Sequence, residues 1–211
     1  MSWYDRHVLP RLIEWAMHDR RIARYRKPVL AAASGRVLEI GFGTGANLPY
    51  YPAQIKQLDI VEPHTGISAR AARHIAASDI DVVPHCLGAE RLPFGSGSFD
   101  TVVSTFTLCS IPAVGAALDE VRRVLKPGGR FVFLEHGLSP EPAIARWQHR
   151  RTPLQKRIGG GCHLDRPVRE LIETAGLTIE PEKFDQRYAA KLPRLVGWLT
   201  SGRSEEHTSE L

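Results

Sequence analysis

Cysteine is scarce in this chain and widely spaced. The 211 residues include three cysteines, Cys86, Cys109 and Cys162. An odd number of distant cysteines argues against a disulfide framework and is compatible with a reducing compartment, so we expect a cytoplasmic protein. The cysteines also lack the close spacing of zinc-binding motifs, and on this ground we expect no metal site.

The sequence also lacks an uninterrupted apolar run long enough to cross a bilayer, and we find no signal peptide in it. It contains no internal repeat or low-complexity tract, and no groove-reading or base-stacking module that would indicate nucleic acid as a partner. Hydrophobic residues make up 43% of the chain and charged residues 24%, which is ordinary for a folded domain. We therefore expect one domain with a full-sized core.

The last residues, 203–211, lack apolar periodicity and match the in-frame translation of a common sequencing adapter. We interpret them as foreign and leave them out of the expected fold. Because they carry one arginine and three glutamates, the rest of the chain is more basic than the overall net charge of +5. On this interpretation the last strand of the domain is truncated.

What the sequence does contain is a glycine-rich turn after the apolar run 37–40, which predicts a buried strand. Glycine lets the backbone turn tightly and lets a ligand lie against it, and the start of a following helix offers N–H groups to an anion. Two chemistries fit this turn. Residues Glu39, Gly41, Gly43 and Gly45 resemble the first motif of class I S-adenosylmethionine-dependent methyltransferases, and Gly41, Gly43 and Ala46 satisfy a dinucleotide-binding fingerprint.

An acid follows the second predicted strand. Glu62 lies 21 positions after Gly41, where a carboxylate accepts hydrogen bonds from ribose hydroxyls. Strand and helix patterns alternate along the chain, so we predict an α/β fold with a Rossmann-like, doubly wound, mostly parallel sheet. The predicted strands cover 37–40, 57–62, 81–86, 98–105, 130–136, 178–180 and 195–199, and the predicted helices cover 2–19, 67–77, 112–126, 141–155 and 167–175.

Further motifs follow in a recognisable order, namely 89–94 with 98–100, and 123–129. With the glycine turn they resemble class I S-adenosylmethionine-dependent methyltransferases, most closely the ubiquinone/menaquinone C-methyltransferase-like group. Residues 107–111, 134–136 and 161–164 resemble the branch that includes small-thiol methyltransferases, whose bacterial relatives are compared with phospholipid N-methyltransferases. The resemblance implies S-adenosyl-L-methionine as cofactor and about seven strands, the last of them antiparallel.

The resemblance also implies a cofactor site along the first four strands. The three glycines would approach the methionine portion of the cofactor. Glu39 would orient the loop or the amino group, and Glu62 would hold the ribose. Gly88 departs from the family, because many relatives have an aspartate there that accepts from the adenine amino group. The residues implied are Glu39, Gly41, Gly43, Gly45, Glu62, Ala89, Glu90 and Thr105.

The implied reaction is in-line transfer of a methyl group from a sulfonium to a thiol, a quinone or phenol, or a phospholipid amine. Since the donor is already activated, the protein mainly positions the reactants and excludes water. Two histidines are candidate proton acceptors: His136 ends the fifth strand, and His163 lies in a glycine-flanked loop. Each also has a structural interpretation, His136 as a capped strand end and His163 as a partner that fixes the loop through Asp165.

We divide residues 1–202 into an N-terminal helical cap (1–33), a cofactor-binding core (34–136) and substrate-side and C-terminal elements (137–202). Trp3, Trp15 and Trp147, together with arginines, favour a hydrophobic or amphipathic small-molecule or lipid acceptor, or a weak peripheral membrane contact. The basic stretch 20–27 is interpreted as a solvated helix face, with a membrane or substrate contact as the alternative. Two alternatives stay open at this point, a nicotinamide-dependent oxidoreductase and a non-catalytic cofactor-binding protein.

Overall fold

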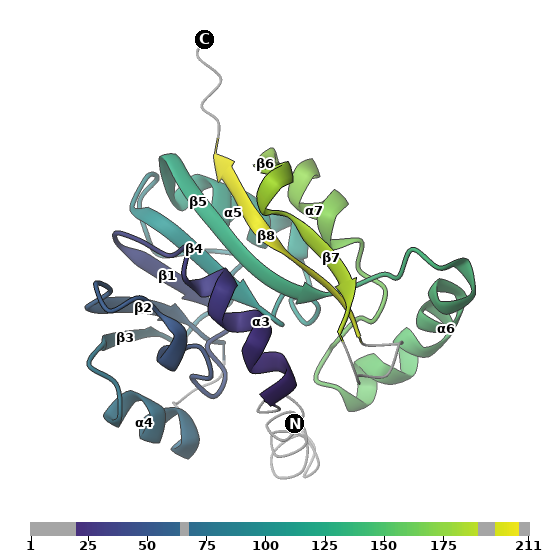
Figure 1. Cartoon of the computed structure of the whole chain (residues 1–211), viewed down its shortest axis with the longest axis horizontal. Helices are drawn as coiled ribbons and strands as arrows, with labels where there is room; N and C mark the ends of the chain where they lie inside the picture. Colours follow the sequence, from purple (N-terminus) through teal and green to yellow (C-terminus); the bar gives the residue numbers. More distant parts are fainter. Residues whose placement is uncertain (1–19, 64–67, 190–196, 207–211) are drawn as a thin grey trace.

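Figure 1 shows the computed structural model of the chain, which describes residues 20–63, 68–189 and 197–206. Its centre is an eight-stranded sheet with the order β3-β2-β1-β4-β5-β8-β6, and β7 pairs with β8 beside this path. The strands are β1 (Val37–Ile40), β2 (Gln57–Val61), β3 (Asp81–His85), β4 (Phe99–Thr105), β5 (Leu125–His136), β6 (Leu177–Ile179), β7 (Asp185–Tyr188) and β8 (Trp198–Glu206).

The described helices lie on both sides of this sheet (Figure 1). They are α3 (Arg20–Leu30), α4 (Ala69–Ala76), α5 (Val114–Val124), α6 (Pro142–Ile158) and α7 (Val168–Thr174), with 3₁₀ turns η1 (Leu48–Tyr50) and η2 (Pro181–Lys183). The helix predicted over 2–19 lies outside the described residues. None of the described helices combines the length and the apolar character needed to span a membrane.

The strand pairing confirms the predicted sheet. β1 pairs in parallel with β2 and β4, β2 with β3, and β4 with β5. β8 is antiparallel to β5, β6 and β7. The short strand β7 is additional to the strands that the sequence predicted. The carboxyl ends of β1, β2, β4 and β5 therefore meet at one edge, where open parallel sheets form their sites.

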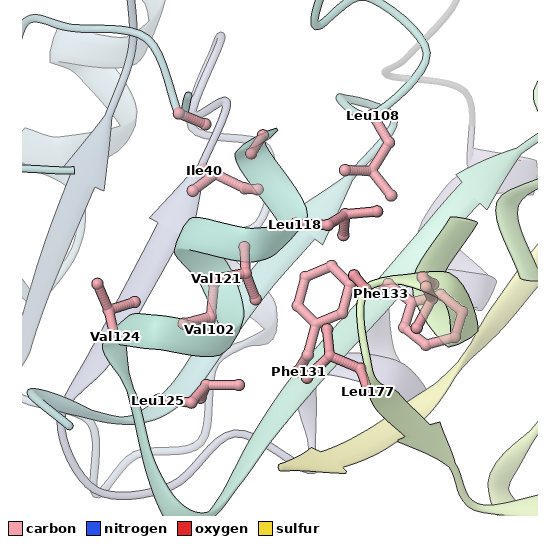
Figure 2. Close-up of a cluster of buried hydrophobic side chains, with 14 of the residues drawn as sticks. Ile40, Val102, Leu108, Leu118, Val121, Val124, Leu125, Phe131, Phe133 and Leu177 are labelled. Carbon is pink, nitrogen blue, oxygen red and sulfur yellow. The ribbon is translucent and has the colours of Figure 1, made fainter. Parts of the chain in front are cut away.

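Alternating strand residues feed two hydrophobic cores, one on each face of the sheet. Val102 of β4 and Phe131 of β5 belong to the core under α5 and α7, whereas their neighbours Val103 and Val132 belong to the core under α3 and α4. Figure 2 shows the first core, where Leu118 and other α5 side chains point toward β4 and β5. Because successive side chains of a strand point to opposite faces, one apolar run covers both layers.

The start of β5 differs from the prediction. The sequence predicted a turn over 126–129 and a strand from 130, but Leu125 already pairs with Phe99, and Arg130 pairs with Thr101. Residues 126–129 therefore form a bulge inside the ladder, and Gly128 adopts a φ of 71° there. A Pro-Gly-Gly sequence after a helix is compatible with a turn that precedes the next strand or with a bulge inside that strand. Only the strand pairing distinguishes the two.

The expectation that residues 203–211 stand outside the fold is wrong for the part that the structure describes. β8 runs through 203–206, with Arg203 opposite Val132 of β5 and Ser204 opposite both Phe131 and Ile179. Ser204 is fully buried. Main-chain pairing on both sides stabilises this segment without any apolar periodicity, which is why the sequence pattern missed it. The foreign origin of 203–211 stays a prediction.

Candidate active site

The glycine turn directly follows β1. The Gly41 N–H donates to the Val61 carbonyl over 2.8 Å, and Gly41, Gly43 and Gly45 have φ values of 74°, 55° and 73°. A side chain added to Gly41 would collide with Thr107, so the turn packs closely against the segment that follows β4. A side chain added to Gly43 would meet nothing within 4 Å. The turn is therefore closed on one side and open beside Gly43.

Glu62 lies beside this open position. Its Oε2 accepts a hydrogen bond of 3.0 Å from the Gly43 N–H. The structure thus brings together two residues that the sequence selected independently, one for its place in the turn and one for its place after β2. A carboxylate at the open side of such a turn is suited to accept hydrogen bonds from ribose hydroxyls.

Glu39 points into the protein and is 1% exposed. Its carboxylate accepts from Asn47 Nδ2 over 2.9 Å and from the Tyr51 hydroxyl over 2.7 Å. Burial raises the pKa of Glu39 to about 7, although these hydrogen bonds and the charge of Arg26 oppose the rise. Since Asn47 and Tyr51 follow the glycine turn, Glu39 fixes the position of that segment.

Arg26 completes this buried network and was missed by the sequence analysis. Its Nη1 donates to Asn47 Oδ1 and, over 2.9 Å, to Thr105 Oγ1, and Asn47 Nδ2 also lies 2.9 Å from Thr105 Oγ1. Arg26 is 4% exposed, so the interpretation of 20–27 as an entirely solvated face is wrong. The sequence feature that indicates the burial of Arg26 is its helical spacing of four residues from Ile22 and from Leu30, both of which are buried.

The segment after β3 carries the predicted adenine-side residues. Ala89 is buried, and the Glu90 carboxylate lies so close to Gly88 that a side chain at position 88 would collide with it. Glu90 therefore occupies the space that a side chain at position 88 would take. Arg123 of α5 anchors the segment by donating to the carbonyls of Phe94, over 2.7 Å, and Leu92, over 3.2 Å.

A second buried carboxylate joins β4 to β5. Glu135 accepts from the Ser104 hydroxyl over 2.7 Å and from the Thr107 N–H over 3.0 and 3.1 Å. Burial raises its pKa to about 7, and Cys109 adds to the rise. Thr107 Oγ1 in turn donates to the Gly41 carbonyl over 3.4 Å. Glu135 therefore connects the end of β5 to the glycine turn through one residue.

Both predicted histidines lie at this same edge of the sheet. His136 Nε2 is 3.3 Å from Cys162 Sγ, and the His163 N–H donates to the Cys109 carbonyl over 2.9 Å. His163 Nδ1 is 3.8 Å from an Asp165 oxygen. Burial lowers the pKa of His163, and the charges of Arg166 and Lys156 add to this effect, so its imidazole is neutral near pH 7.

α6 packs against the segment that directly follows β5. Its Gln148 is fully buried and links two backbone groups, donating to the Gly137 carbonyl over 3.0 Å and accepting from the Ser139 N–H over 2.8 Å. The opposite side of α6 exposes large apolar side chains, with Trp147 50% exposed. Trp3 and Trp15, the other predicted aromatic residues of a substrate cap, lie outside the described residues.

A cleft of about 690 Å³ lies elsewhere, between α3 and the C-terminal strands. Arg24, Tyr25 and Val29 line one wall, and Lys183, Arg187 and Arg203 line the other. None of the predicted site residues lines this cleft. The candidate active site is therefore the edge formed by the glycine turn and the segments after β2, β4 and β5.

The fold and this edge define a class I methyltransferase, and comparison with known proteins agrees. Residues 38–133 match the family described as Methyltransferase domain. Human thiol S-methyltransferase TMT1B is 36% identical over 182 residues, which cover 82% of this chain and 70% of the relative. A phosphatidylethanolamine N-methyltransferase from Cereibacter sphaeroides is 34% identical over 64% of this chain and 74% of the relative.

A solved structure supports the fold. The 1,6-didemethyltoxoflavin-N1-methyltransferase of Burkholderia thailandensis, solved with S-adenosylhomocysteine, has a TM-score of 0.62 at 18% identity. The match covers 99% of this chain and 92% of that one. The chain spans 58% and 62% of the length of the rat and mouse thiol S-methyltransferases TMT1B.

The chain belongs to the class I S-adenosylmethionine-dependent methyltransferases, in the group that includes thiol S-methyltransferase TMT1B and the ubiquinone/menaquinone C-methyltransferases. S-adenosyl-L-methionine is its methyl donor. The open space beside Gly43 and the adjacent Glu62 carboxylate fit a cofactor of this kind. These relatives give no support to the nicotinamide-dependent alternative.

Proposed function

We propose that this enzyme transfers the methyl group to the sulfur of a small thiol. The observation that carries this proposal is the 36% identity to a thiol S-methyltransferase over 82% of the chain. Support comes from the site, because the turn after β4, the end of β5 and the loop after α6, which resemble the thiol branch in sequence, meet at the edge beside the glycine turn. A thiol suits such a site, since its pKa near 8.5 makes it easy to deprotonate.

The cofactor-binding roles follow from the same positions. Gly41, Gly43 and Gly45 let the backbone approach the methionine portion, and Glu62 accepts from the ribose. Ala89 and Glu90 border the adenine. Glu39 acts on the loop rather than on the ligand, because its carboxylate is bonded to Asn47 and Tyr51. Thr105 supports the methionine end through its hydrogen bond with Arg26.

His163 is the better of the two candidate proton acceptors. Its side chain is 27% exposed, so a thiol can reach it, and its lowered pKa keeps the imidazole neutral at neutral pH. His136 is 8% exposed and lies against Cys162, which favours a different role. The remaining chemistry needed from the protein is to hold donor and acceptor in line and to exclude water.

We also propose a cytoplasmic location with a weak peripheral membrane contact through α6. Trp147, Leu154 and Ile158 are 50%, 51% and 46% exposed and share one face of the helix. The guanidinium groups of Arg150 and Arg151 lie 5.8 and 5.4 Å from the Trp147 ring centre. An exposed apolar stripe flanked by cations is typical of helices that rest on anionic lipid surfaces.

Cofactor binding is tested by a thermal-shift titration with S-adenosylhomocysteine. A ligand that binds only the native state stabilises it, by about 2.7 kcal/mol at a concentration of 100 Kd. We expect Glu62→Ala to weaken binding about 10-fold to 100-fold, because hydrogen bonds to a charged group contribute about 1.5–3 kcal/mol. Glu170→Ala, which removes an exposed acid of α7, is the control and should leave the shift unchanged.

The acceptor is tested by measuring S-adenosylhomocysteine formation with a small aliphatic thiol, a quinol, and vesicles of phosphatidylethanolamine. We expect turnover with the thiol and an S-methyl product in the mass spectrum. Turnover only with the vesicles would instead favour the phospholipid amine. Binding of S-adenosylhomocysteine without turnover of any acceptor would favour the non-catalytic alternative.

Sedimentation with anionic vesicles tests the membrane contact. We expect the wild-type protein to sediment with the vesicles and Trp147→Ala to sediment less.

A further inference from the structure

Cys109, His136 and Cys162 form a compact cluster that the proposed methyl transfer has not used. The two Sγ atoms and one imidazole nitrogen lie within 4.8 Å of one another, and the distance from Cys162 Sγ to His136 Nε2 is 3.3 Å. The residues come from three distant segments: the turn after β4, the end of β5, and the loop after α6. No short sequence motif brings them together, so their convergence is a property of the fold.

Backbone contacts hold the two cysteine segments in place. The His163 N–H donates to the Cys109 carbonyl over 2.9 Å, and Arg166 Nη2 donates to the Ile111 carbonyl over 2.6 Å. Gly161, with a φ of 84°, lies so close to Ser110 that an added Cβ would be 3.4 Å from the Ser110 carbonyl oxygen. These contacts fix the two thiols relative to each other before any ligand binds.

The donor set matches one type of metal site. Two thiol sulfurs and one imidazole are soft and borderline ligands that select zinc over magnesium or calcium. Catalytic zinc sites typically have three protein ligands and leave the fourth tetrahedral position for water or substrate, and Cys₂His is one such set. Two thiolates also neutralise Zn²⁺, which suits a place where Cys109 is 4% and His136 8% exposed.

The cluster lies next to the glycine turn. Thr107 donates to the Gly41 carbonyl over 3.4 Å, and two residues later the chain reaches Cys109. Glu135, whose carboxylate accepts from the Thr107 N–H, directly precedes His136. A group bound at the open position of the cluster would therefore stand at the edge of the sheet where the methyl donor binds.

We propose that Cys109, His136 and Cys162 bind one Zn²⁺, and that its fourth position takes the sulfur of the acceptor thiol as a thiolate. This inference rests on the proposed thiol methyltransferase function and replaces the expectation from cysteine spacing that the chain has no metal site. A coordinated thiol is deprotonated at neutral pH, so the zinc would supply the nucleophile without a strong base.

The step balances without another reactant. On binding to the metal, the acceptor thiol loses its proton to solvent water and becomes a thiolate. The thiolate sulfur then forms a bond to the methyl carbon. The bond from that carbon to the sulfonium sulfur breaks, and its electron pair stays on the sulfur of S-adenosylhomocysteine. The neutral thioether product is a weaker zinc ligand than the thiolate and leaves.

The first experiment measures metal binding by the full chain, purified in reductant without chelator. We expect about one zinc per chain by elemental mass spectrometry, and cobalt–thiolate absorbance when the stripped protein is titrated with Co²⁺. Cys109→Ser and Cys162→Ser should weaken zinc binding about 100-fold or more, since even changes outside the ligand shell cost 10–100-fold. Cys86→Ser, at an exposed cysteine outside the cluster, is the matched control.

A thermal shift with S-adenosylhomocysteine shows whether each variant is folded. Wild-type protein that gives this shift but neither retains zinc nor produces cobalt–thiolate absorbance overturns the inference. So does a Cys109–Cys162 disulfide that persists in reductant.

The second experiment removes the zinc from the wild-type enzyme with a chelator. We expect loss of thiol methylation, recovery on adding Zn²⁺, and an unchanged shift with S-adenosylhomocysteine. Undiminished S-methylation by zinc-free enzyme overturns the role of the metal but leaves the proposed function intact. Failure of the zinc-loaded enzyme to methylate any thiol contradicts the proposed function itself, so the two failures are distinguishable.

Discussion

Glu39 and Glu135 are buried carboxylates on the two strands that flank β4, and they are held in different ways. Both are at most 1% exposed, and burial raises the pKa of each to about 7. Glu39 is bonded by the side chains of Asn47 and Tyr51, with Arg26 close by. Glu135 is bonded by the Ser104 hydroxyl and by the Thr107 backbone N–H.

The difference shows that two carboxylates with similar burial and similarly raised pKa values can depend on different numbers of structural elements. The partners of Glu39 come from the segment after the glycine turn and from α3, so its network depends on several elements packing together. The partners of Glu135 come from β4 and the turn after it, next to β5 in the sheet. We therefore expect substitutions around Glu39 to cost more stability than matched substitutions around Glu135.

The largest effect is expected for Arg26→Met, which breaks the Glu39 network. It removes the donor to Thr105 and Asn47 and leaves the Glu39 carboxyl without a nearby positive charge. Removing one member of a buried charged network costs about 3–5 kcal/mol of unfolding free energy. Urea denaturation measures this loss. Arg24→Met, which changes an exposed arginine of the same helix, should stay within about 0.5 kcal/mol of wild type.

The pH dependence of stability tests the raised pKa of Glu39. Its folded pKa of about 7 exceeds the ordinary value of 4.5, so the folded state binds more protons between these values. The stability that protonated Glu39 contributes to the folded state is fully present below pH 4.5 and is lost as the pH rises through 7. We expect wild type to lose about 3 kcal/mol through this group, and Glu39→Gln to lack that loss. Parallel curves for the two proteins, from denaturation at several pH values, would contradict the assignment.

The smallest and sharpest test compares two neighbouring hydroxyls of β4. Thr105→Val removes an acceptor that faces both Arg26 and Asn47, so two buried donors lose it, at a cost of about 1–3 kcal/mol. Ser104→Ala removes one donor from Glu135, which keeps the Thr107 N–H, and should cost about 1 kcal/mol. Urea denaturation of both variants measures the two losses of unfolding free energy. A larger loss for Ser104→Ala than for Thr105→Val would contradict the expectation that the Glu39 network is the more sensitive one.

Much of the cofactor edge was predictable from local patterns. The apolar run 37–40, the glycines after it and the acid after the next strand each have a short-range cause, and the structure brings Gly43 and Glu62 into hydrogen-bond contact. The alternation of strands and helices likewise predicted the parallel sheet. Arg26 was missed because one basic residue in a basic stretch shows its buried position only through its helical spacing from apolar neighbours.

The sequence by itself determined the α/β class, the glycine turn and the acid after β2, because each depends on residues close together in the chain. Only the tertiary structure decided that Arg26 joins Glu39, that 203–206 continue β8, and that Cys109, His136 and Cys162 converge. These features depend on contacts between segments distant in sequence. Such contacts form when packing and strand pairing bring the segments together, and no local periodicity records them.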